Sequence, residues 1–236
     1  MQSEINFFEG IQRILSLHNI LSISGESGTG KTTLALQLIG KFLTYKEPYT
    51  SSCIWIQASD QFTLKRLTHI FEDNPKELEY ITKNIYIIPQ KKPVHNYEEQ
   101  SSTIQKIINP TTIIPPFLKY IVIDNISHHL RYKLTQYSTP KHALSLLDSF
   151  YETQLMPLLL FCKRNKIVLI MIHEYTYSPS LQKSKPFFYK LYDRINTIDM
   201  ILNNVYNSDK KNLHVIFNML NWHFQYVLEH RGIKII

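Results

Sequence analysis

The sequence predicts an α/β fold, in which a central, mostly parallel twisted sheet is flanked by helices and carries antiparallel strands at its C-terminal edge. Three observations support this prediction. Apolar strands alternate with helical segments up to residue 172, which is typical of a parallel sheet. A glycine-rich turn follows the first strand. Beyond residue 184, strand-like segments follow one another without helices, which favours antiparallel pairing.

The individual elements follow from the spacing of apolar residues. Residues 4–17 have the periodicity of a helix, residues 20–24 form a short strand that ends at Gly25, and residues 31–43 form a strongly apolar helix. We expect a kink at Pro157, because proline cannot donate a helical hydrogen bond. The same patterns predict strands at 53–57, 84–89, 119–124, 166–172, 198–204, 213–220 and 222–230, and helices at 62–72, 77–83, 97–108 and 140–162.

Residues 90–118 are the least regular part of the chain. They are polar, contain four prolines and include one predicted helix. They could link two domains, but the next strand resumes the same alternation, so we interpret them as a long connection inside one domain. We therefore expect residues 1–236 to form a single domain.

Composition limits the class of protein. With 44% hydrophobic and 19% charged residues, the chain is typical of globular proteins. A net charge of +7 favours an anionic partner, with nucleic acid first, without requiring one. The sequence shows no signal peptide and no apolar run long enough to span a membrane, so we expect an intracellular protein without a membrane partner. Cys53 and Cys162 lie far apart in apolar surroundings, which indicates buried free thiols.

Residues 25–33 carry the features of a phosphate-binding loop. Its glycines let backbone N–H groups close around phosphate oxygens, its lysine reaches the β- and γ-phosphates, and the hydroxyl after the lysine binds Mg²⁺. The motif stands between a predicted strand and a predicted helix, as such loops require. We therefore predict binding of ATP and Mg²⁺ by Gly25, Glu26, Ser27, Gly28, Thr29, Gly30, Lys31, Thr32 and Thr33.

A carboxylate at the end of a buried strand is the expected second partner of the metal. Asp124 ends the strand at 119–124 and is the best candidate. Alone, such a residue could simply begin a turn. Beside the phosphate-binding loop, it predicts a magnesium site in which Thr32 supplies a hydroxyl and Asp124 holds the metal through its water shell.

Five segments, taken in order along the chain, form a recognisable set. They are GESGTGKTTLALQL, IWIQASDQFTLKRL, YIVIDNISHHLRYKLTQYS, HALSLLDSFYETQLMPLLLFCKRNKIVLIMIHEY and FQYVLEHRGIKI. This ordered set resembles the RecA superfamily and, within it, the archaeal RadA and RadB recombinases and their eukaryotic paralogues. KaiC-like ATPases have a similar loop sequence, but the final segment and the loop after Tyr175 fit the recombinases better.

The resemblance implies a RecA-like ATPase core without the N-terminal helix-hairpin-helix domain of the family. It implies an accessory protein of homologous recombination and DNA repair, which binds ATP, single-stranded DNA and another subunit of the recombinase fold. The protein would work in the nucleus of a eukaryote or the cytoplasm of an archaeon. Two alternatives stay open: a nucleotide-stabilised scaffold subunit of a mediator complex, and a KaiC-like signalling ATPase that does not bind DNA.

Two departures from the family pattern concern hydrolysis. Ser59 stands where the resemblance places the catalytic glutamate, and serine cannot act as a base at neutral pH. Asp60, the next residue, is a substitute. His173-Glu174 replaces the family's Asn-Gln pair, so an acidic side chain lies where a glutamine senses the γ-phosphate. We assign Lys31, Asp60 and Glu174 as the candidate catalytic residues and expect weak or absent hydrolysis.

Residues 176–194 correspond to the second DNA-facing loop of the family, and residues 120–138 include the first. Both contain cations, and the second interleaves them with aromatic residues that can stack on bases. Alternatively, the FFYKLY segment packs inward. His128-His129 could suggest a metal site, but without a third ligand we interpret it as a solvated basic face. The predicted DNA-binding residues are Arg131, Lys133, Lys183, Lys185, Lys190 and Arg194.

Overall fold

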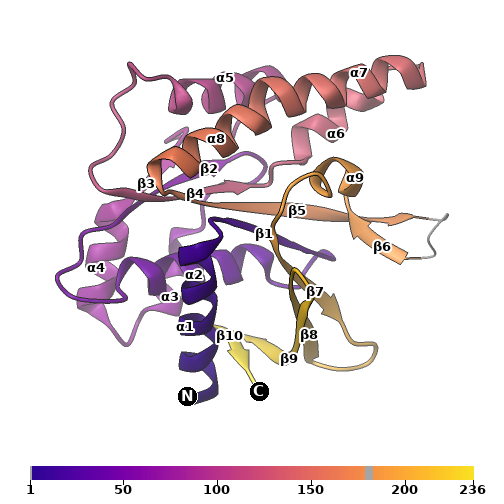
Figure 1. Cartoon of the computed structure of the whole chain (residues 1–236). Helices are drawn as coiled ribbons and strands as arrows, with labels where there is room; N and C mark the ends of the chain where they lie inside the picture. Colours follow the sequence, from indigo (N-terminus) through magenta and orange to yellow (C-terminus); the bar gives the residue numbers. More distant parts are fainter. Residues whose placement is uncertain (1, 179–182) are drawn as a thin grey trace.

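A single twisted sheet runs through the part of the chain that the computed structural model describes, which is residues 2–178 and 183–236 (Figure 1). Side chains are described for residues 7–175 and 185–236. Within these ranges the sheet has ten strands, in the order β10-β9-β8-β7-β1-β5-β4-β2-β3, with β6 paired to β5. The α/β fold predicted from the sequence is confirmed.

The centre of the sheet is parallel, because helices return the chain from the end of one strand to the start of the next. Strand β1 is flanked by β5 on one side and β7 on the other, both parallel to it. The parallel strands are β1 (Ile20–Gly25), β2 (Ser52–Gln57), β3 (Ile85–Ile88), β4 (Leu118–Asp124), β5 (Val168–Ser178) and β7 (Ile198–Asn204).

The antiparallel extension predicted for the C-terminal edge is present, and β7 joins it to the parallel part of the sheet. This strand is parallel to β1 on one side and antiparallel to β8 on the other. The short helix α9 (Tyr189–Tyr192) carries the chain back before β7 begins. The strands β8 (Lys210–Phe217), β9 (Leu220–Glu229) and β10 (Gly232–Ile235) then form the antiparallel edge.

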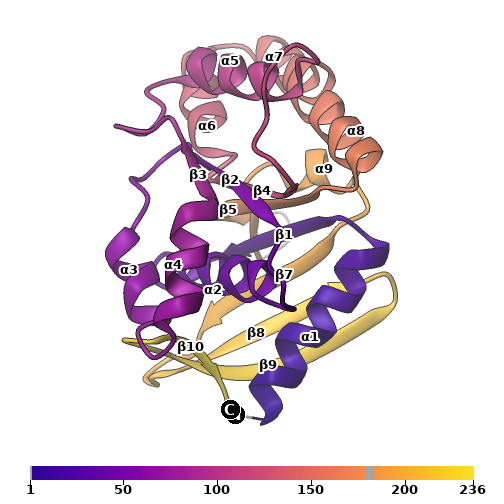
Figure 2. The same ribbon diagram turned by 90° about the vertical axis from the view of Figure 1, so that its left-hand side faces the viewer.

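Helices cover both faces of the sheet, as Figure 2 shows. One face carries α1 (Gln2–Leu17), α2 (Lys31–Leu43), α3 (Leu64–Ile70) and α4 (Pro75–Asn84). The other carries α5 (Tyr97–Ile108), α6 (His128–Thr135), α7 (Pro140–Phe150) and α8 (Met156–Asn165). Each helical layer closes its own apolar cluster against the sheet.

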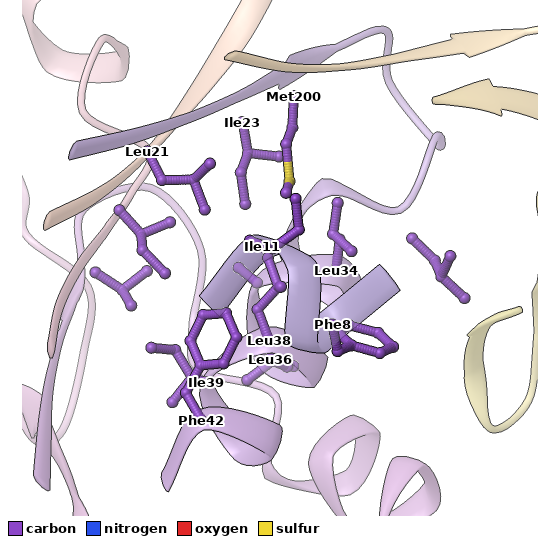
Figure 3. Close-up of a cluster of buried hydrophobic side chains, with 14 of the residues drawn as sticks. Phe8, Ile11, Leu21, Ile23, Leu34, Leu36, Leu38, Ile39, Phe42 and Met200 are labelled. Carbon is purple, nitrogen blue, oxygen red and sulfur yellow. The ribbon is translucent and has the colours of Figure 1, made fainter. Parts of the chain in front are cut away.

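Helix α2 lies at the centre of the first cluster. Leu34 and Leu38 on α2 pack beneath Leu21 and Ile23 of β1, with Ile11 of α1 beside them (Figure 3). Burial of this kind contributes roughly 1.5–3 kcal/mol for each large aliphatic side chain. The strand that precedes the glycine-rich loop and the helix that follows it are therefore both fixed by the core, and the loop is held between two rigid supports.

The structure also contains elements that the sequence did not predict. Helix α6 occupies part of the segment interpreted as a DNA-facing loop, and strand β6 (Lys183–Pro186) forms a hairpin with β5. The predicted helix 140–162 is interrupted by a π-helical turn at Tyr151–Leu155, just before Pro157, which stands in the first turn of α8.

The two cysteines are buried free thiols, as the sequence predicted. Burial raises the pKa of both, to about 12 for Cys162, so neither thiol is reactive. Among the described residues, no helix is long and apolar enough to cross a membrane.

The packing of α2 leaves no room for a side chain at Gly40. A methyl group on Gly40 would collide with the ring of Phe71, which is buried. Alanine gains about 1 kcal/mol of helix propensity over glycine, whereas overpacking a core costs about 1–3 kcal/mol. We therefore expect Gly40→Ala to lower the free energy of unfolding by up to about 2 kcal/mol, measured by urea denaturation.

Gly10→Ala is the matched control for this prediction. Gly10 lies in α1, and an added methyl group meets no atom within 4 Å. This substitution should leave the free energy of unfolding unchanged or raise it by up to about 1 kcal/mol. Equal effects of the two substitutions would show that the contact with Phe71 does not limit the packing of α2.

Candidate nucleotide-binding site

The glycine-rich loop connects β1 to α2 at the carboxyl edge of the parallel strands. Gly28 and Gly30 adopt left-handed φ angles of 75° and 91°, which other residues rarely tolerate. Gly30 also caps α2, so the first N–H groups of the helix face the loop. A helix N-terminus preceded by such a turn is a ready-made anion site. The local geometry is that of a phosphate cradle.

The strands at the edge of the sheet hold the loop in place. The hydroxyl of Tyr226 on β9 donates to the Thr29 carbonyl at 2.7 Å, and Asn204 donates to the Glu26 carboxylate at 2.7 Å. Thr29 is buried, and its own hydroxyl donates to the Glu26 carbonyl at 2.8 Å. Sequence analysis missed Tyr226, because a contact over almost two hundred residues leaves no local pattern.

Lys31 lies at the start of α2 and folds its ammonium back over the loop. Its Nζ atom donates to the carbonyl oxygens of Gly25 at 3.0 Å and Glu26 at 2.8 Å. Burial lowers the pKa of Lys31 from its ordinary value, while Asp124, Glu174 and Glu26 act in the opposite direction. The ammonium therefore has neutral acceptors here that phosphate oxygens can replace.

Thr32 and Asp124 meet as the sequence predicted for a magnesium pair. The Thr32 hydroxyl donates to Oδ2 of Asp124 at 2.8 Å. Asp124 is buried, and burial raises the pKa of its carboxyl group to about 6. A hydroxyl and a buried carboxylate are oxygen donors of the kind that Mg²⁺ takes beside nucleotide phosphates. The two residues fit the metal that the loop implies.

A cavity of about 460 Å³ opens over the loop. Its walls include seven of the nine predicted loop residues and all three acidic residues predicted outside the loop, Asp60, Asp124 and Glu174. Glu26 and Thr29 do not line the cavity and instead support the loop. The cavity is lined by Gly25, Ser27, Gly28, Gly30, Lys31, Thr32, Thr33, Ser59, Asp60, Asp124, Asn125, Arg131, Ile172, Glu174 and Tyr175.

Ser59 and Asp60 follow β2 and face this cavity. The backbone N–H of Ser59 donates to the Asp124 carbonyl at 3.0 Å, which fixes the turn beside the metal pair. The Ser59 hydroxyl donates to Oδ2 of Asp60 at 3.2 Å. Asp60 is exposed, and its shorter side chain starts one residue beyond the position that the resemblance gives to a catalytic glutamate.

Glu174 is neutralised within the chain. Its carboxylate pairs with Arg131 at 2.7 Å and with His128 at 3.3 Å, and both partners come from α6. Arg131 also lies over the ring of Phe187 at 5.1 Å. A carboxylate beside bound phosphates would repel them, so this ion pair removes the conflict that the sequence raised. Arg131 was assigned to DNA from the resemblance, yet it lines the nucleotide cavity.

The two adjacent histidines do not form a solvated basic face. His129 is buried and donates from Nε2 to the Val94 carbonyl at 2.9 Å, while His128 pairs with Glu174. The interpretation failed because α6 turns His129 toward the connection at 90–96. No group of three or more metal-ligating side chains occurs among the described residues. His173 is fully buried on the opposite face of the sheet from Glu174.

The remaining cations predicted for DNA differ in their surroundings. Lys133 pairs with Glu98 at 2.6 Å, and Arg194 pairs with Asp148 at 3.6 Å. Lys185 places its ammonium 4.3 Å from the ring centre of Tyr189, and Lys190 is exposed. Lys183 lies on β6, but its side chain falls outside the described residues, as do residues 179–182 of the predicted loop.

The order of the strands, the loop after β1 and the acidic residue at the end of β4 define a RecA-like P-loop NTPase fold. A family described as Novel STAND NTPase 3 matches residues 3–83, less than half of the chain, including the loop. The crystal structure of the RadB recombinase is similar over 91% of this chain and 89% of that chain, with a TM-score of 0.67 and 18% identity. At this identity the likeness shows the fold. No curated protein sequence matches the chain.

The raised pKa of Asp124 predicts a pH-dependent stability. The carboxyl group titrates near 3.8 in the unfolded chain and at about 6 in the folded one. Stability is therefore lost as the pH rises through this window, because the folded chain holds the proton more tightly. We expect Asp124→Asn to be more stable than the unchanged protein by about 1–3 kcal/mol at pH 7, without nucleotide.

Urea denaturation at pH 4 and pH 7 tests this expectation. The difference between Asp124→Asn and the unchanged protein should be small at pH 4 and large at pH 7. Asp209→Asn, which changes an exposed carboxylate, should show no such difference. A constant difference between the two pH values would mean that Asp124 titrates normally in the folded chain.

Proposed function

We propose that this protein is an ATP-binding recombinase paralogue that assists homologous recombination and DNA repair with weak or absent ATP hydrolysis. One observation carries the proposal. The phosphate cradle, Lys31 and the Thr32–Asp124 pair are all in place, and the cavity wall has Ser59 where the resemblance to the recombinases gives a catalytic glutamate. Such a site holds ATP and Mg²⁺ without an efficient way to activate the attacking water.

Single-stranded DNA is the proposed nucleic-acid partner, and the β5–β6 hairpin with α9 is the proposed contact. Lys185 and Lys190 lie on this segment together with Phe187, Phe188 and Tyr189. Lysines that track phosphates, combined with aromatic faces that stack on bases, are typical of single-strand binding. A second subunit of the recombinase fold is the proposed protein partner, in keeping with the likeness to the RadB fold.

A nucleotide-stabilised scaffold is the second candidate, and the ion pairs favour it. Three of the six cations assigned to DNA are paired with acidic residues of this chain: Arg131, Lys133 and Arg194. Paired cations offer less to a phosphate backbone than free ones. In this candidate, bound ATP stabilises the fold for a partner protein, and DNA is not bound.

Salt-dependent binding of a fluorescent oligonucleotide, with ATP and Mg²⁺ present, distinguishes the two candidates. We expect binding that weakens steeply with salt. The double substitution Lys185→Ala/Lys190→Ala should weaken binding and reduce the slope of log K against log[salt] by about 0.7 for each phosphate contact removed. Turnover of ATP in the same samples should stay well below about 1 s⁻¹, a rate at the lower end for working enzymes.

The control is Lys119→Ala/Lys163→Ala, which removes two exposed lysines from the start of β4 and the end of α8. These positions lie at the opposite edge of the sheet from the nucleotide cavity. Equal loss of DNA binding in both double variants would show only an effect of net charge. Absence of DNA binding in the unchanged protein would reject the first candidate and leave the scaffold.

A further inference from the structure

A second cavity lies on the face of the sheet that does not contact α2. Side chains alternate along β1, so that Leu21 and Ile23 face α2 while Ser22 and Ser24 face the other side. There, helix α9 and the segment after it line a cavity of about 610 Å³ together with residues of β1, β5 and β7. Figure 1 shows α9 next to β5 on this face of the sheet. Of the described residues that line the two cavities, Tyr175 alone is common to both.

Among the described residues, two buried polar side chains in the wall of this cavity have no hydrogen-bond partner. Within the described residues, the two ring nitrogens of His173 and the hydroxyl of Tyr192 make no hydrogen bond. His173 is 0% exposed and Tyr192 is 7% exposed, and their rings lie edge to face at 4.3 Å. Buried polar groups are normally satisfied, so each of these groups calls for an explanation.

The unpaired groups of His173 and Tyr192 include both hydrogen-bond donors and acceptors. Burial lowers the pKa of His173 to about 3, so its ring is neutral and has one N–H donor and one acceptor nitrogen. The Tyr192 hydroxyl can serve in either role. A ligand that satisfies all of these atoms must itself carry donors and acceptors close together.

Asp199 adds a fixed acceptor to the same wall. It lies beside Ser22 in the register of β7 with β1, and the Thr197 hydroxyl donates to its Oδ1 atom at 2.7 Å. Burial raises the pKa of Asp199, so a hydrogen-bond donor on a ligand would stabilise its charged form. At the rim, Lys185 holds its ammonium over the ring of Tyr189.

We propose that this cavity, bounded by Ser24, His173, Tyr189, Tyr192 and Asp199, is a binding site for a nucleobase. A base is planar and fits between aromatic rings, and its edge presents amino and ring N–H donors beside acceptor nitrogens and oxygens. Lys185 is placed to meet the phosphate of the same nucleotide. The base can come from a free nucleotide or from a DNA strand; only the second source depends on the function proposed above.

The first arm of the test uses free 2-aminopurine riboside, whose fluorescence is quenched when its base stacks. The probe has no phosphate, so it does not depend on the phosphate cradle, and Lys31→Ala should bind it normally. We expect saturable quenching in the unchanged protein. Tyr192→Phe and Asp199→Asn should each weaken binding by about tenfold, the loss of one buried hydrogen bond.

Matched controls separate the cavity from general effects of the substitutions. Tyr206→Phe and Asp209→Asn make the same chemical changes at exposed positions and should leave the probe affinity unchanged. Tyr192→Phe keeps the ring that contacts His173, so the fold should survive. Without a ligand it should also raise the melting temperature, because it removes a hydroxyl that has no partner in the described structure.

The second arm places one 2-aminopurine in the middle of a single-stranded oligonucleotide and follows binding by polarisation and the base by fluorescence. The proposal is supported if Tyr192→Phe weakens the quenching in either arm. The arm in which this happens identifies the source of the base, a free nucleotide or a DNA strand. The base site is rejected, and DNA binding is supported, if the oligonucleotide binds but the cavity variants change the fluorescence of neither probe. The base site is supported, and DNA binding is rejected, if the oligonucleotide does not bind while the riboside binds and the cavity variants weaken its binding.

Discussion

Lys31→Ala is expected to abolish nucleotide binding, with a loss of ATP affinity of about 100-fold or more. A hydrogen bond to a charged group contributes about 1.5–3 kcal/mol, and about 2.7 kcal/mol corresponds to 100-fold in affinity. Lys31 is the residue whose ammonium lies over the loop, at 3.0 Å and 2.8 Å from the carbonyl oxygens of Gly25 and Glu26. Without it, the β- and γ-phosphates lose their cationic partner in the cradle.

Isothermal titration with ATP and Mg²⁺ measures this loss directly, and the shift in melting temperature caused by ATP measures it through stability. Ligand binding to the folded state stabilises it in proportion to the logarithm of ligand concentration over Kd. The unchanged protein should therefore melt at higher temperature with ATP, and Lys31→Ala should not. Lys46→Ala, at an exposed position beyond the far end of α2, is the matched control.

The fold of the apoprotein should survive the substitution, because the lysine contributes little to the core. Its two hydrogen bonds go to loop carbonyls, and one of these bonds is partly buried and the other exposed. We expect the free energy of unfolding without nucleotide to change by less than about 1 kcal/mol. If ATP still stabilises Lys31→Ala as it stabilises the control, the cavity over the loop is not the principal nucleotide site.

Local patterns were enough to predict the loop and most of the sheet. The helix at 31–43 and the helix at 97–108 occur with the predicted bounds, because apolar periodicity and clear ends coincide in both. Helix α6 was missed because its sequence, HHLRYKLT, is polar on most sides and buries little more than His129 and Leu130. Its helical form depends on packing against the second apolar cluster rather than on its own periodicity.

The electrostatics of the site could not be predicted in the same way. Glu174 was identified as a charge in conflict with phosphate, but its partner Arg131 lies 43 positions away and was assigned to DNA on the basis of the resemblance. The burial of Tyr192 could not be predicted from the sequence either. Sequence left open whether the FFYKLY segment faces DNA or packs inward, and the structure divides it, with Leu191 and Tyr192 inside and Lys190 outside.

Ser59→Glu is expected to raise ATP turnover by about 100-fold. A positioned general base contributes about 10² to 10⁴ to a rate, and the rest of the phosphate-transfer site is already present. Ser59 lines the cavity that contains Lys31, Thr32 and Asp124, so a longer acidic side chain at this position can reach toward the γ-phosphate. Single-turnover hydrolysis of ATP with Mg²⁺ measures the chemical step separately from product release.

Ser59→Gln is the control, because it has nearly the same shape and no basic carboxylate. If Ser59→Glu hydrolyses ATP faster and Ser59→Gln does not, the slow hydrolysis of the unchanged protein results from the lack of a general base. An equal increase in both variants would indicate a change in loop packing instead. The introduced carboxylate also lies near Asp60, so ATP affinity should be measured in the same samples to separate a faster step from weaker binding.

The rate of ATP turnover by the unchanged protein tests whether the base is missing at all. If it already turns over ATP at about 1 s⁻¹ or faster, another group acts as the base, and the loss of the family glutamate has been compensated. Asp60→Ala and Glu174→Ala then identify that group, since both side chains line the cavity. Glu174 is the weaker candidate on physical grounds. The ion pair with Arg131 and the contact with His128 hold its carboxylate in place, so it is not free to turn toward an attacking water.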